Sequence, residues 1–553
     1  MGKPYYGLRG LHLSIAIATI AGCDFALFGY DQGVMGGLLT LDGFLKTFPQ
    51  IDTNSPPHGW TKQKASNVQG ITVGGYTLGC FFGAAATIWL GNILGRRKTI
   101  FTGTCIMIVG ATIQCSSYSL GQLIAARLIT GFGNGMNTST VPIWQSETSK
   151  SNRRGQMVMI EGVLIVFGVM LSYWIDLGFS FLDPSSIAWR FPLAFQIVLC
   201  LFIVSTVLGL PESPRWLILK GRDKEALQVL SALADLPEDD ERIQFEFNAV
   251  KDVVFEMSKG KFIDCFDRNP NRNLHRTILA YVNQMFQQIS GINIITYYAA
   301  TVFKSIGLSG FLSRLLAACN GTEYFMASWV AVFTIEKFGR RQLMLFGAVG
   351  QACSMAVLAA TSANLQSKAC GVVAAIFLFV FNSFFAVGWL GMTWLYPAEI
   401  TPLSIRAPAT ALSTTANWIF NFMVVMVTPP AFASIGYNTY TVFACINAFM
   451  VPCVYFFYPE TAYRSLEEMD EIFHDISGLK GALTVVKVAH DKPRRFGKNG
   501  ELLIRYEDTE AYRRGSTMRR RSSTAPVPES ETKHVQGDGE VTLEEEKKDR
   551  DSN

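Results

Sequence analysis

The sequence predicts an all-α membrane protein with twelve transmembrane helices in two pseudo-symmetric six-helix bundles. Nearly half of the 553 residues are apolar and only 17% are charged, a balance typical of chains that lie in lipid. The apolar residues also gather in blocks of roughly twenty, the length that a helix needs to cross about 30 Å of hydrocarbon. Three short motifs of the first half recur in the second half, which indicates a duplicated unit.

Twelve such apolar blocks can be read along the chain. Most carry no charge, and runs such as Ile71 to Leu90 are continuously apolar and small, so a β-barrel with alternating residues is disfavoured. The expected spans are 11–32, 69–90, 99–117, 121–144, 157–177, 187–210, 277–302, 312–335, 343–362, 369–396, 407–430 and 437–458.

The positive charges of the short loops predict the orientation in the membrane. They cluster at 96–98, 150–154, 337–341 and Arg406, which all fall on one side of the expected bilayer. Cytoplasmic loops carry the excess of Lys and Arg, so this side is expected to be cytoplasmic. Both termini are then cytoplasmic and the loop 33–68 is external; we expect a multi-pass protein of the plasma membrane.

The duplicated motifs lie at the cytoplasmic ends of the expected helices. Gly95-Arg96-Arg97 returns 244 residues later, Glu147 with Arg154 returns after 252, and Pro211-Glu212-Ser213 returns after 248 as Pro459-Glu460-Thr461. The chain therefore divides into a first bundle (1–211), a cytoplasmic linker with short helices (212–275), a second bundle (276–458) and a largely disordered tail (459–553), whose disorder is expected from about Arg513.

Arginines beside glutamates at these helix ends predict a cytoplasmic gate. Such pairs can hold helix ends together in one conformation and release them in another. The alternative is that the arginines only anchor helix ends on the positive side of the membrane. The candidate gate residues are Arg96, Arg97, Glu147, Arg154, Glu212, Arg340, Arg341, Glu399 and Arg406.

Taken together, these motifs resemble the sugar porter family of the major facilitator superfamily over residues 10–475. The resemblance rests on Gly29-Tyr30-Asp31, Arg127 with Gly131 and Gly135, Glu147 with Arg154, 211–215, Gln287-Gln288 before Tyr297-Tyr298, and Pro397 with Glu399 and Arg406. Fungal proton-coupled monosaccharide transporters look most similar. The resemblance implies the major facilitator fold and alternating access around a site between the two halves.

Asp31 and Arg127 are the candidates for proton coupling. Ionisable groups at membrane depth cost on the order of 3 kcal/mol, so each is a candidate functional group. A carboxylate that alternates between an arginine and a proton can couple protonation to helix movement. In the family, symporters tend to have Asp at position 31. The alternative is a static ion pair that only fixes helix packing.

Amide and aromatic side chains are the candidates for solute binding. Amides offer donors and acceptors to sugar hydroxyls, and aromatic faces stack on pyranose rings; Gly291 would let the helix bend. The alternatives are amides that join helices without a ligand, and structural tryptophans. The candidates are Gln287, Gln288, Asn293, Tyr297, Trp394, Asn417, Trp418, Asn421 and the mid-membrane carboxylate Glu323.

Several positions depart from the family pattern, which leaves the pocket chemistry open. The family's sugar-binding Gln is Gly162 here, preceded by Glu161, the helix 312–335 has Tyr324 where Asn is common, and Asn92 replaces an acidic gate residue. Glu161 is a candidate for the gate. The pocket therefore does not identify the solute.

We expect proton-coupled uptake of a hexose or pentose by a monomer. Its partners would be the sugar, protons and the lipid bilayer, with no nucleic acid, cofactor or metal, and no enzymatic constellation is visible in the sequence. The alternatives are a facilitative carrier, a polyol or oligosaccharide carrier, and a sugar sensor that does not transport.

Overall fold

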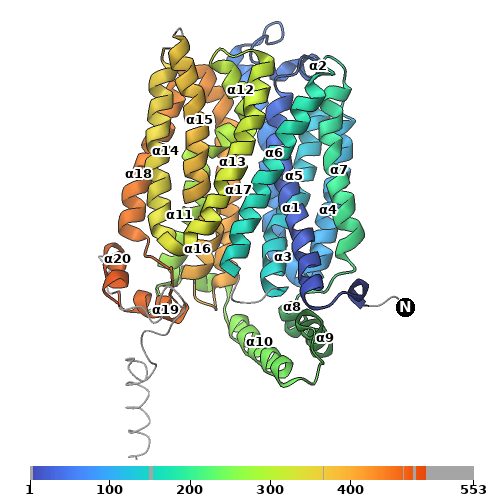
Figure 1. Cartoon of the computed structure of the whole chain (residues 1–553), viewed down its shortest axis with the longest axis vertical. Helices are drawn as coiled ribbons and strands as arrows, with labels where there is room; N and C mark the ends of the chain where they lie inside the picture. Colours follow the sequence, from blue (N-terminus) through green and yellow to red (C-terminus); the bar gives the residue numbers. More distant parts are fainter. Residues whose placement is uncertain (1–3, 149–153, 365–366, 465, 477–480, 493–553) are drawn as a thin grey trace, which may run out of the picture. The chain divides into compact units, whose positions relative to one another are not determined.

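The computed structural model describes residues 4–148, 154–364, 367–464, 466–476 and 481–492. These residues contain no strand, and nine of their helices are long and apolar enough to span a membrane by length and composition alone. Each of the twelve expected spans corresponds to a helix or to a broken pair of helices, although the spans 99–117, 187–210 and 437–458 run slightly past the observed helix ends (Figure 1). The all-α prediction is confirmed. The predicted disorder of the tail beyond 492 lies outside the described residues.

Six long helices make up the first half. They pack side by side and are followed by the short helices of the expected linker (Figure 1). In order they are α1 (Gly10–Leu38), α3 (Lys62–Leu94), α4 (Arg96–Cys115), α5 (Leu120–Thr148), α6 (Arg154–Ser180) and α7 (Ile187–Val207), with the short α2 (Asp42–Thr47) and η2 (Pro49–Ile51) between α1 and α3. The linker holds α8 (Pro214–Leu219), α9 (Asp223–Ala234), α10 (Glu241–Lys259) and η4 (Phe262–Phe266).

The second half repeats this arrangement, but two of its six spans are broken. Its first span consists of α11 (Asn273–Gln287), the π-helical turn η5 (Gln288–Ile292) and α12 (Asn293–Ser305), and its fourth of α15 (Lys368–Gly388) and α16 (Met392–Ile400). The other elements are α13 (Gly310–Phe338), α14 (Arg340–Ser362), α17 (Arg406–Ile435), α18 (Asn438–Phe457), α19 (Leu466–His474) and α20 (Gly481–Asp491).

Three of the twelve spans do not meet this criterion of length and apolar composition. They are α5, α13 and the broken α11–α12 pair. Helix α5 buries Arg127 and Asn137, and α13 buries Asn320 and carries Glu323. These polar groups lower the hydropathy of the helices that contain them. The sequence criterion of apolar blocks found them because each still holds about twenty mostly uncharged residues.

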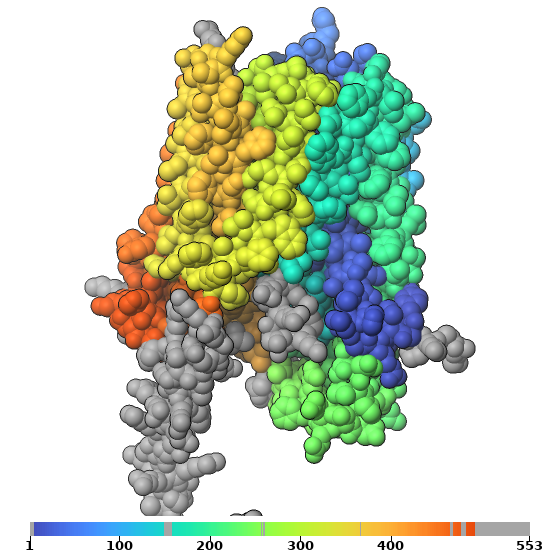
Figure 2. Space-filling model, viewed as in Figure 1, coloured from blue at the N-terminus to red at the C-terminus, as the bar shows by residue number. Residues whose placement is uncertain are grey.

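The two halves meet mainly along two helix pairs, α3 with α17 and α6 with α13, and α1 also packs against α12. Figure 2 shows the second pair side by side on one face of the molecule. The end that carries α8–α10 is called the linker end and the opposite end the α2 end (Figure 1). Towards the α2 end the halves approach closely, since a Cβ on Gly70 of α3 would lie 2.3 Å from the carbonyl oxygen of Met426.

Glycines set the distance between α1 and α6 within the first half. A Cβ on Gly29 of α1 would lie 1.8 Å from the carbonyl oxygen of Ile165, and one on Gly168 of α6 would lie 1.9 Å from that of Ala26. Small residues let membrane helices approach to backbone contact, and this contact replaces the hydrophobic effect that lipid does not supply. The close approach fixes the face of α1 that carries Asp31.

Gly29→Ala is expected to lower the unfolding temperature of the purified protein in detergent, because an added methyl group in a packed interface costs about 1–3 kcal/mol. The matched control is Gly178→Ala in α6, where an added Cβ meets nothing within 4 Å and helix propensity favours alanine. Thermal unfolding followed by circular dichroism measures both. Equal midpoints for the two variants would contradict the close packing of α1 on α6.

Candidate functional site

The break between α11 and α12 presents side chains of the span to the centre of the molecule. Gly291 has φ 99°, a conformation that favours glycine, and Tyr298 in α12 also departs from helical geometry at φ −134° and ψ 18°. The predicted bend at Gly291 is present. A π-helical turn of this kind is frequent at functional sites because it re-aims side chains and frees backbone groups.

A chain of buried amides joins this broken span to α17. Asn417 Nδ2 donates to Oε1 of Gln284 (2.7 Å) and of Gln287 (3.0 Å). Gln288 Nε2 donates to Gln287 Oε1 (3.1 Å), and Asn293 Nδ2 donates to Gln288 Oε1 (2.8 Å). The structure therefore brings four predicted solute ligands together, and without solute they satisfy one another, as buried amides must.

Next to this amide chain lie polar atoms that have no partner. The hydroxyl of Tyr297 lies beside Asn421 and Gln32, yet it makes no hydrogen bond, and neither do Asn421 Oδ1 and Trp418 Nε1. Trp418 packs edge-on against Phe28 of α1, with 5.3 Å between ring centroids. Unpaired polar atoms in a dry site cost free energy, so these groups are available for a polar ligand.

Asp31 of α1 and Arg127 of α5 are fully buried, on the side of the first half that faces the second half. Arg127 Nη2 donates to the carbonyl oxygen of Val73 (3.2 Å), and the guanidinium lies 5.2 Å from the ring centroid of Tyr76. Neither oxygen of Asp31 has a hydrogen-bond partner. The two groups interact electrostatically, but they form no contact of 4.0 Å or less in this conformation.

The two sets of candidates adjoin one another across the interface between the halves. Arg127 has Asp31 and Tyr76 as electrostatic neighbours in the first half, and Tyr297 and Tyr298 in the second. Tyr297 also lies next to Gln32, the residue after Asp31. The structure thus brings together groups that the sequence analysis assigned separately to proton and solute.

Trp394 and Glu323 lie apart from the amide chain. Trp394 is half-buried in α16, and no side-chain hydrogen bond or ring contact of it occurs among the described residues. Glu323 accepts a short hydrogen bond from Ser383 of α15, so it ties α13 to α15 within the second half. Their roles in solute binding remain predictions.

Trp389 is a residue that the sequence analysis missed. It is completely buried at the break between α15 and α16, and its carbonyl oxygen accepts a hydrogen bond from Gln287 Nε2 (3.2 Å). Its own Nε1 has no partner. The signal in the sequence was the pair Gly388 and Gly391 around it, which marks a break in a helix.

Tyr173 is a second missed residue. Its hydroxyl donates from α6 in the first half to the carbonyl oxygens of Ile295 (3.2 Å) and Thr296 (3.0 Å) in α12. It therefore links the halves at the two residues that precede Tyr297. A lone tyrosine in an apolar helix gives no such signal in the sequence.

At the linker end, the gate residues of the first half form one cluster. Arg96 binds Glu147 through two hydrogen bonds, Nε to Oε2 (3.1 Å) and Nη2 to Oε1 (3.3 Å). Glu212 accepts from the backbone N–H groups of Arg96 (2.9 Å) and Arg97 (3.2 Å). It therefore caps the N-terminus of α4, where orphan N–H groups and the helix dipole favour a carboxylate. Burial raises the pKa of Glu212 above its usual range.

The second half repeats this cluster contact by contact. Arg340 binds Glu399 (2.8 Å), and Glu460 accepts from the backbone N–H groups of Arg340 (2.8 Å) and Arg341 (3.1 Å). Gly95 and Gly339, which precede the two capped helices, have φ of 85° and 86°. The duplication read from the sequence is therefore also a duplication of contacts.

Additional members of the clusters were missed. Trp144 Nε1 donates to the carbonyl oxygen of Pro211 (3.1 Å), and at the equivalent place the Tyr396 hydroxyl donates to that of Pro459 (2.9 Å). Because a tryptophan makes this contact in one half and a tyrosine makes it in the other, sequence identity could not reveal that Trp144 and Tyr396 are equivalent.

The glutamates of the duplicated motifs bind the arginines that begin α4 and α14. Glu147 binds Arg96 and Glu399 binds Arg340, while Arg406 donates to the carbonyl oxygen of Thr401 (3.0 Å); the side chain of Arg154 lies outside the described residues. Each cluster joins helices of its own half. A role in gating remains a prediction.

Three comparisons place the chain among known proteins. The family model described as sugar (and other) transporter matches residues 15–473. The chain is 41% identical to the sugar transporter STL1 of Saccharomyces cerevisiae over 476 residues, covering 85% of this chain and 83% of that protein. It is 38% identical to the MFS-type transporter oryC of Aspergillus oryzae, covering 97% and 98%.

Among solved structures, the fold is similar to the proton:xylose symporter XylE bound to 6-bromo-6-deoxy-D-glucose, a protein of E. coli. The TM-score is 0.70 at 23% sequence identity, and the match covers 83% of this chain and 99% of XylE. This similarity supports the fold.

Arg96→Met and Glu147→Leu are each expected to lower the unfolding free energy by on the order of 3 kcal/mol, because a single change leaves a buried charge without its partner. The double variant is expected to recover much of this loss, since it leaves neither charge. Arg222→Met is the control, because the exposed pair Arg222–Glu225 is worth less than about 1 kcal/mol. Losses that simply add in the double variant would contradict a coupled pair.

Proposed function

The chain belongs to the sugar transporter family of the major facilitator superfamily, and from that premise we propose that it takes up a monosaccharide together with a proton across the plasma membrane. The observation that carries the proposal is the contiguity of Asp31 and Arg127 with Tyr297 and the amide chain. The linker end, rich in Lys and Arg, would face the cytoplasm with both termini, and the α2 end would face outside.

The amide chain supports a solute that carries several hydroxyl groups. Gln287, Gln288, Asn293 and Asn417 are buried and bonded to one another, so a hydroxylated solute can exchange its own donors and acceptors for theirs without leaving a group unpaired. Trp418 offers an apolar face beside them. A purely apolar solute would leave the free atoms of Tyr297 and Asn421 unsatisfied.

The absence of a hydrogen bond between Asp31 and Arg127 supports proton coupling. A buried carboxylate without a hydrogen bond or ion pair is strongly disfavoured as an anion, so this conformation suits the protonated acid. Loss of the proton would draw Asp31 towards the guanidinium, and the α1–α5 packing would change with it. The charge state of Asp31 thereby favours one helix arrangement over another.

The proton-coupling pair Asp31 and Arg127 lies next to the solute groups around Tyr297, and this proximity would couple proton binding to solute binding. Arg127 acts electrostatically on Asp31 and on Tyr297 alike, so solute at Tyr297 and the proton on Asp31 would influence the same group. A proton crossing about 100 mV releases roughly 2.3 kcal/mol and one pH unit adds about 1.4. Together they would sustain a solute gradient of several hundredfold. One chain holds all these groups, so we propose that the monomer transports and that no cofactor takes part.

Tyr297→Phe is expected to weaken solute binding without lowering thermal stability, because the hydroxyl has no partner in the solute-free protein. Tyr298→Phe is the matched control. Its hydroxyl donates to the carbonyl oxygen of Val425 (2.8 Å), so its loss should cost about 1 kcal/mol of stability. Uptake kinetics and thermal unfolding are measured on both variants. Unchanged half-saturation in Tyr297→Phe would place the solute elsewhere.

Asp31→Asn is expected to abolish accumulation of labelled D-glucose or D-xylose above the external concentration while downhill entry persists, because an amide cannot carry the proton. Uptake in transporter-deficient cells at several external pH values, with and without a protonophore, measures this. Asp42→Asn, an exposed carboxylate in α2, is the control. Accumulation by Asp31→Asn equal to that of the wild type would contradict symport, and binding without any uptake by the wild type would indicate a sensor.

A further inference from the structure

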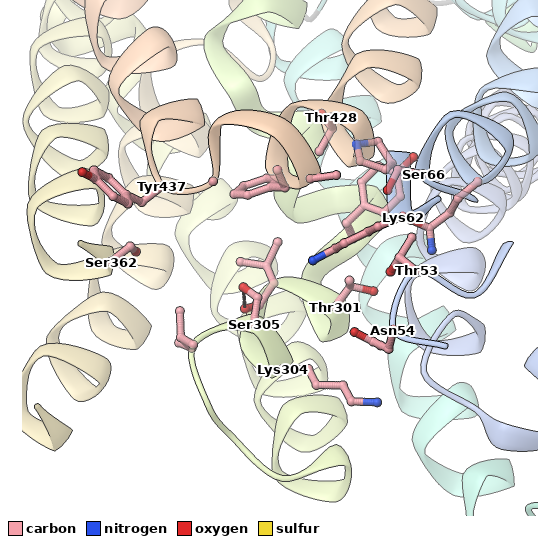
Figure 3. A pocket seen from close by; sticks show the side chains of 18 of the residues that line it. Thr53, Asn54, Lys62, Ser66, Thr301, Lys304, Ser305, Ser362, Thr428 and Tyr437 are labelled. Carbon is pink, nitrogen blue, oxygen red and sulfur yellow. Dashed lines mark hydrogen bonds between the residues drawn. The ribbon is translucent and has the colours of Figure 1, made fainter. Parts of the chain in front are cut away.

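A cavity lies at the α2 end, beyond Tyr298 and away from the amide chain. It has a volume of about 320 Å³ and is lined by α3 of the first half and by α12 and α17 of the second (Figure 3). This volume falls at the lower end of small-molecule sites, roughly 300–1,000 Å³. The cavity is therefore large enough for one small solute.

The walls of this cavity carry buried polar groups without partners. Ser66 and Gln69 of α3 line one wall and are 1% and 4% exposed. Across the cavity, the hydroxyls of Thr301 in α12 and Ser362 at the end of α14 are buried without a hydrogen-bond partner. Each of these two hydroxyls costs about 1–3 kcal/mol unless a ligand or water satisfies it.

The chemistry of the lining indicates which ligand fits. A hydroxyl and an amide on one wall and hydroxyls on the other offer both donors and acceptors, the combination that a ring with several hydroxyl groups requires. Lys62 and Lys304 stand at the rim, and the lining contains no carboxylate. A carboxylate on the ring would therefore be attracted by the two lysines and repelled by no residue of the lining.

The position of the cavity connects it to the central site. Its floor includes Tyr298, the neighbour of Tyr297, and its walls belong to both halves. A solute arriving from the α2 end would meet Ser66 and Gln69 before it reached Tyr297. A site shared between the halves also changes shape when they move.

We propose that this cavity, called the outer site and defined by Ser66, Gln69 and Thr301, binds a small polyhydroxylated ring before it passes to the central amide chain. The proposal rests on the proposed function for its orientation. The outer site binds its ligand independently of Gln287 and Asn417. The competing explanation is a water-filled gap between moving helices, which would show no preference for a hydroxylated ring.

The test measures ligand protection of a thiol placed at the outer site. Ser305, an exposed residue of the lining, is replaced in Ser305→Cys, and labelling by a membrane-impermeant maleimide is timed on intact cells; the chain without this change gives the background of native cysteines. The probes are D-glucose and its carboxylated counterpart D-glucuronate, each against an ionic and osmotic control. At ten times the dissociation constant, labelling is expected to slow about tenfold.

The same protection is expected in a background with Gln287→Ala and Asn417→Ala, which disables the central site. It is expected to disappear in Gln69→Leu and, independently, in the nearly isosteric Thr301→Val, with surface expression confirming that each variant folds. Stronger protection by D-glucuronate than by D-glucose would assign a contribution to the lysines, and equal protection would assign binding to the neutral groups; either result supports the outer site.

Two results would overturn the proposal. One is protection that vanishes in the Gln287→Ala, Asn417→Ala background, because it would then come from the central site. The other is labelling that no probe slows beyond its control, which indicates a water-filled gap. Failure of the proposed function looks different, since a wild type that takes up no solute while protection persists would refute transport and retain the outer site.

Discussion

The arrangement of the centre depends on a carboxylate that is buried without a partner. Asp31 is fully enclosed, with neither oxygen hydrogen-bonded, and the buried cation that acts on it, Arg127, donates instead to the backbone of α3. Proteins rarely leave an acid in this condition, because an ionised carboxylate in a dry interior is among the most costly groups to bury. Its neutral form is compatible with this packing. We propose that the helix contacts around Asp31 depend on whether it carries a proton.

The second half approaches this position with groups that are also incompletely bonded. Tyr297 and Asn421 end in unpaired atoms, whereas the neighbouring amides satisfy one another. The amides that bond to one another stabilise the solute-free protein, and the unpaired atoms of Tyr297 and Asn421 can form hydrogen bonds with a ligand. The clusters at the linker end are different in kind, because each glutamate there caps a helix or binds an arginine within its own half. They join helix ends within each half.

Much of the fold could be predicted from the sequence, because the membrane imposes a length and an apolar composition on every span. The bend at Gly291 was also foreseeable, since glycine there interrupts a helix of amides. Which arginines bind Glu147 and Glu399 was not, because the sequence places several arginines near these helix ends. Arg96 binds Glu147 because Gly95, with its positive φ, lets α4 begin at this point. The equivalence of Trp144 and Tyr396 was hidden too, since it lies in a contact and not in residue identity.

The adjacency of proton and solute groups could not be predicted either, because it requires the packing of α1, α5, α12 and α17 across the interface between the halves. Linkage makes this adjacency measurable, since a ligand that favours protonated Asp31 must take up protons when it binds. The most direct measurement is the pH change on adding D-glucose or D-xylose to purified protein in weakly buffered detergent solution. Because the acid is neutral in this conformation, we expect little uptake at low pH and a rise towards about one proton per solute bound as the pH increases and the solute-free protein loses this proton. Solute binding that takes up no proton at any pH from about 5 to about 9 would contradict proton coupling at Asp31.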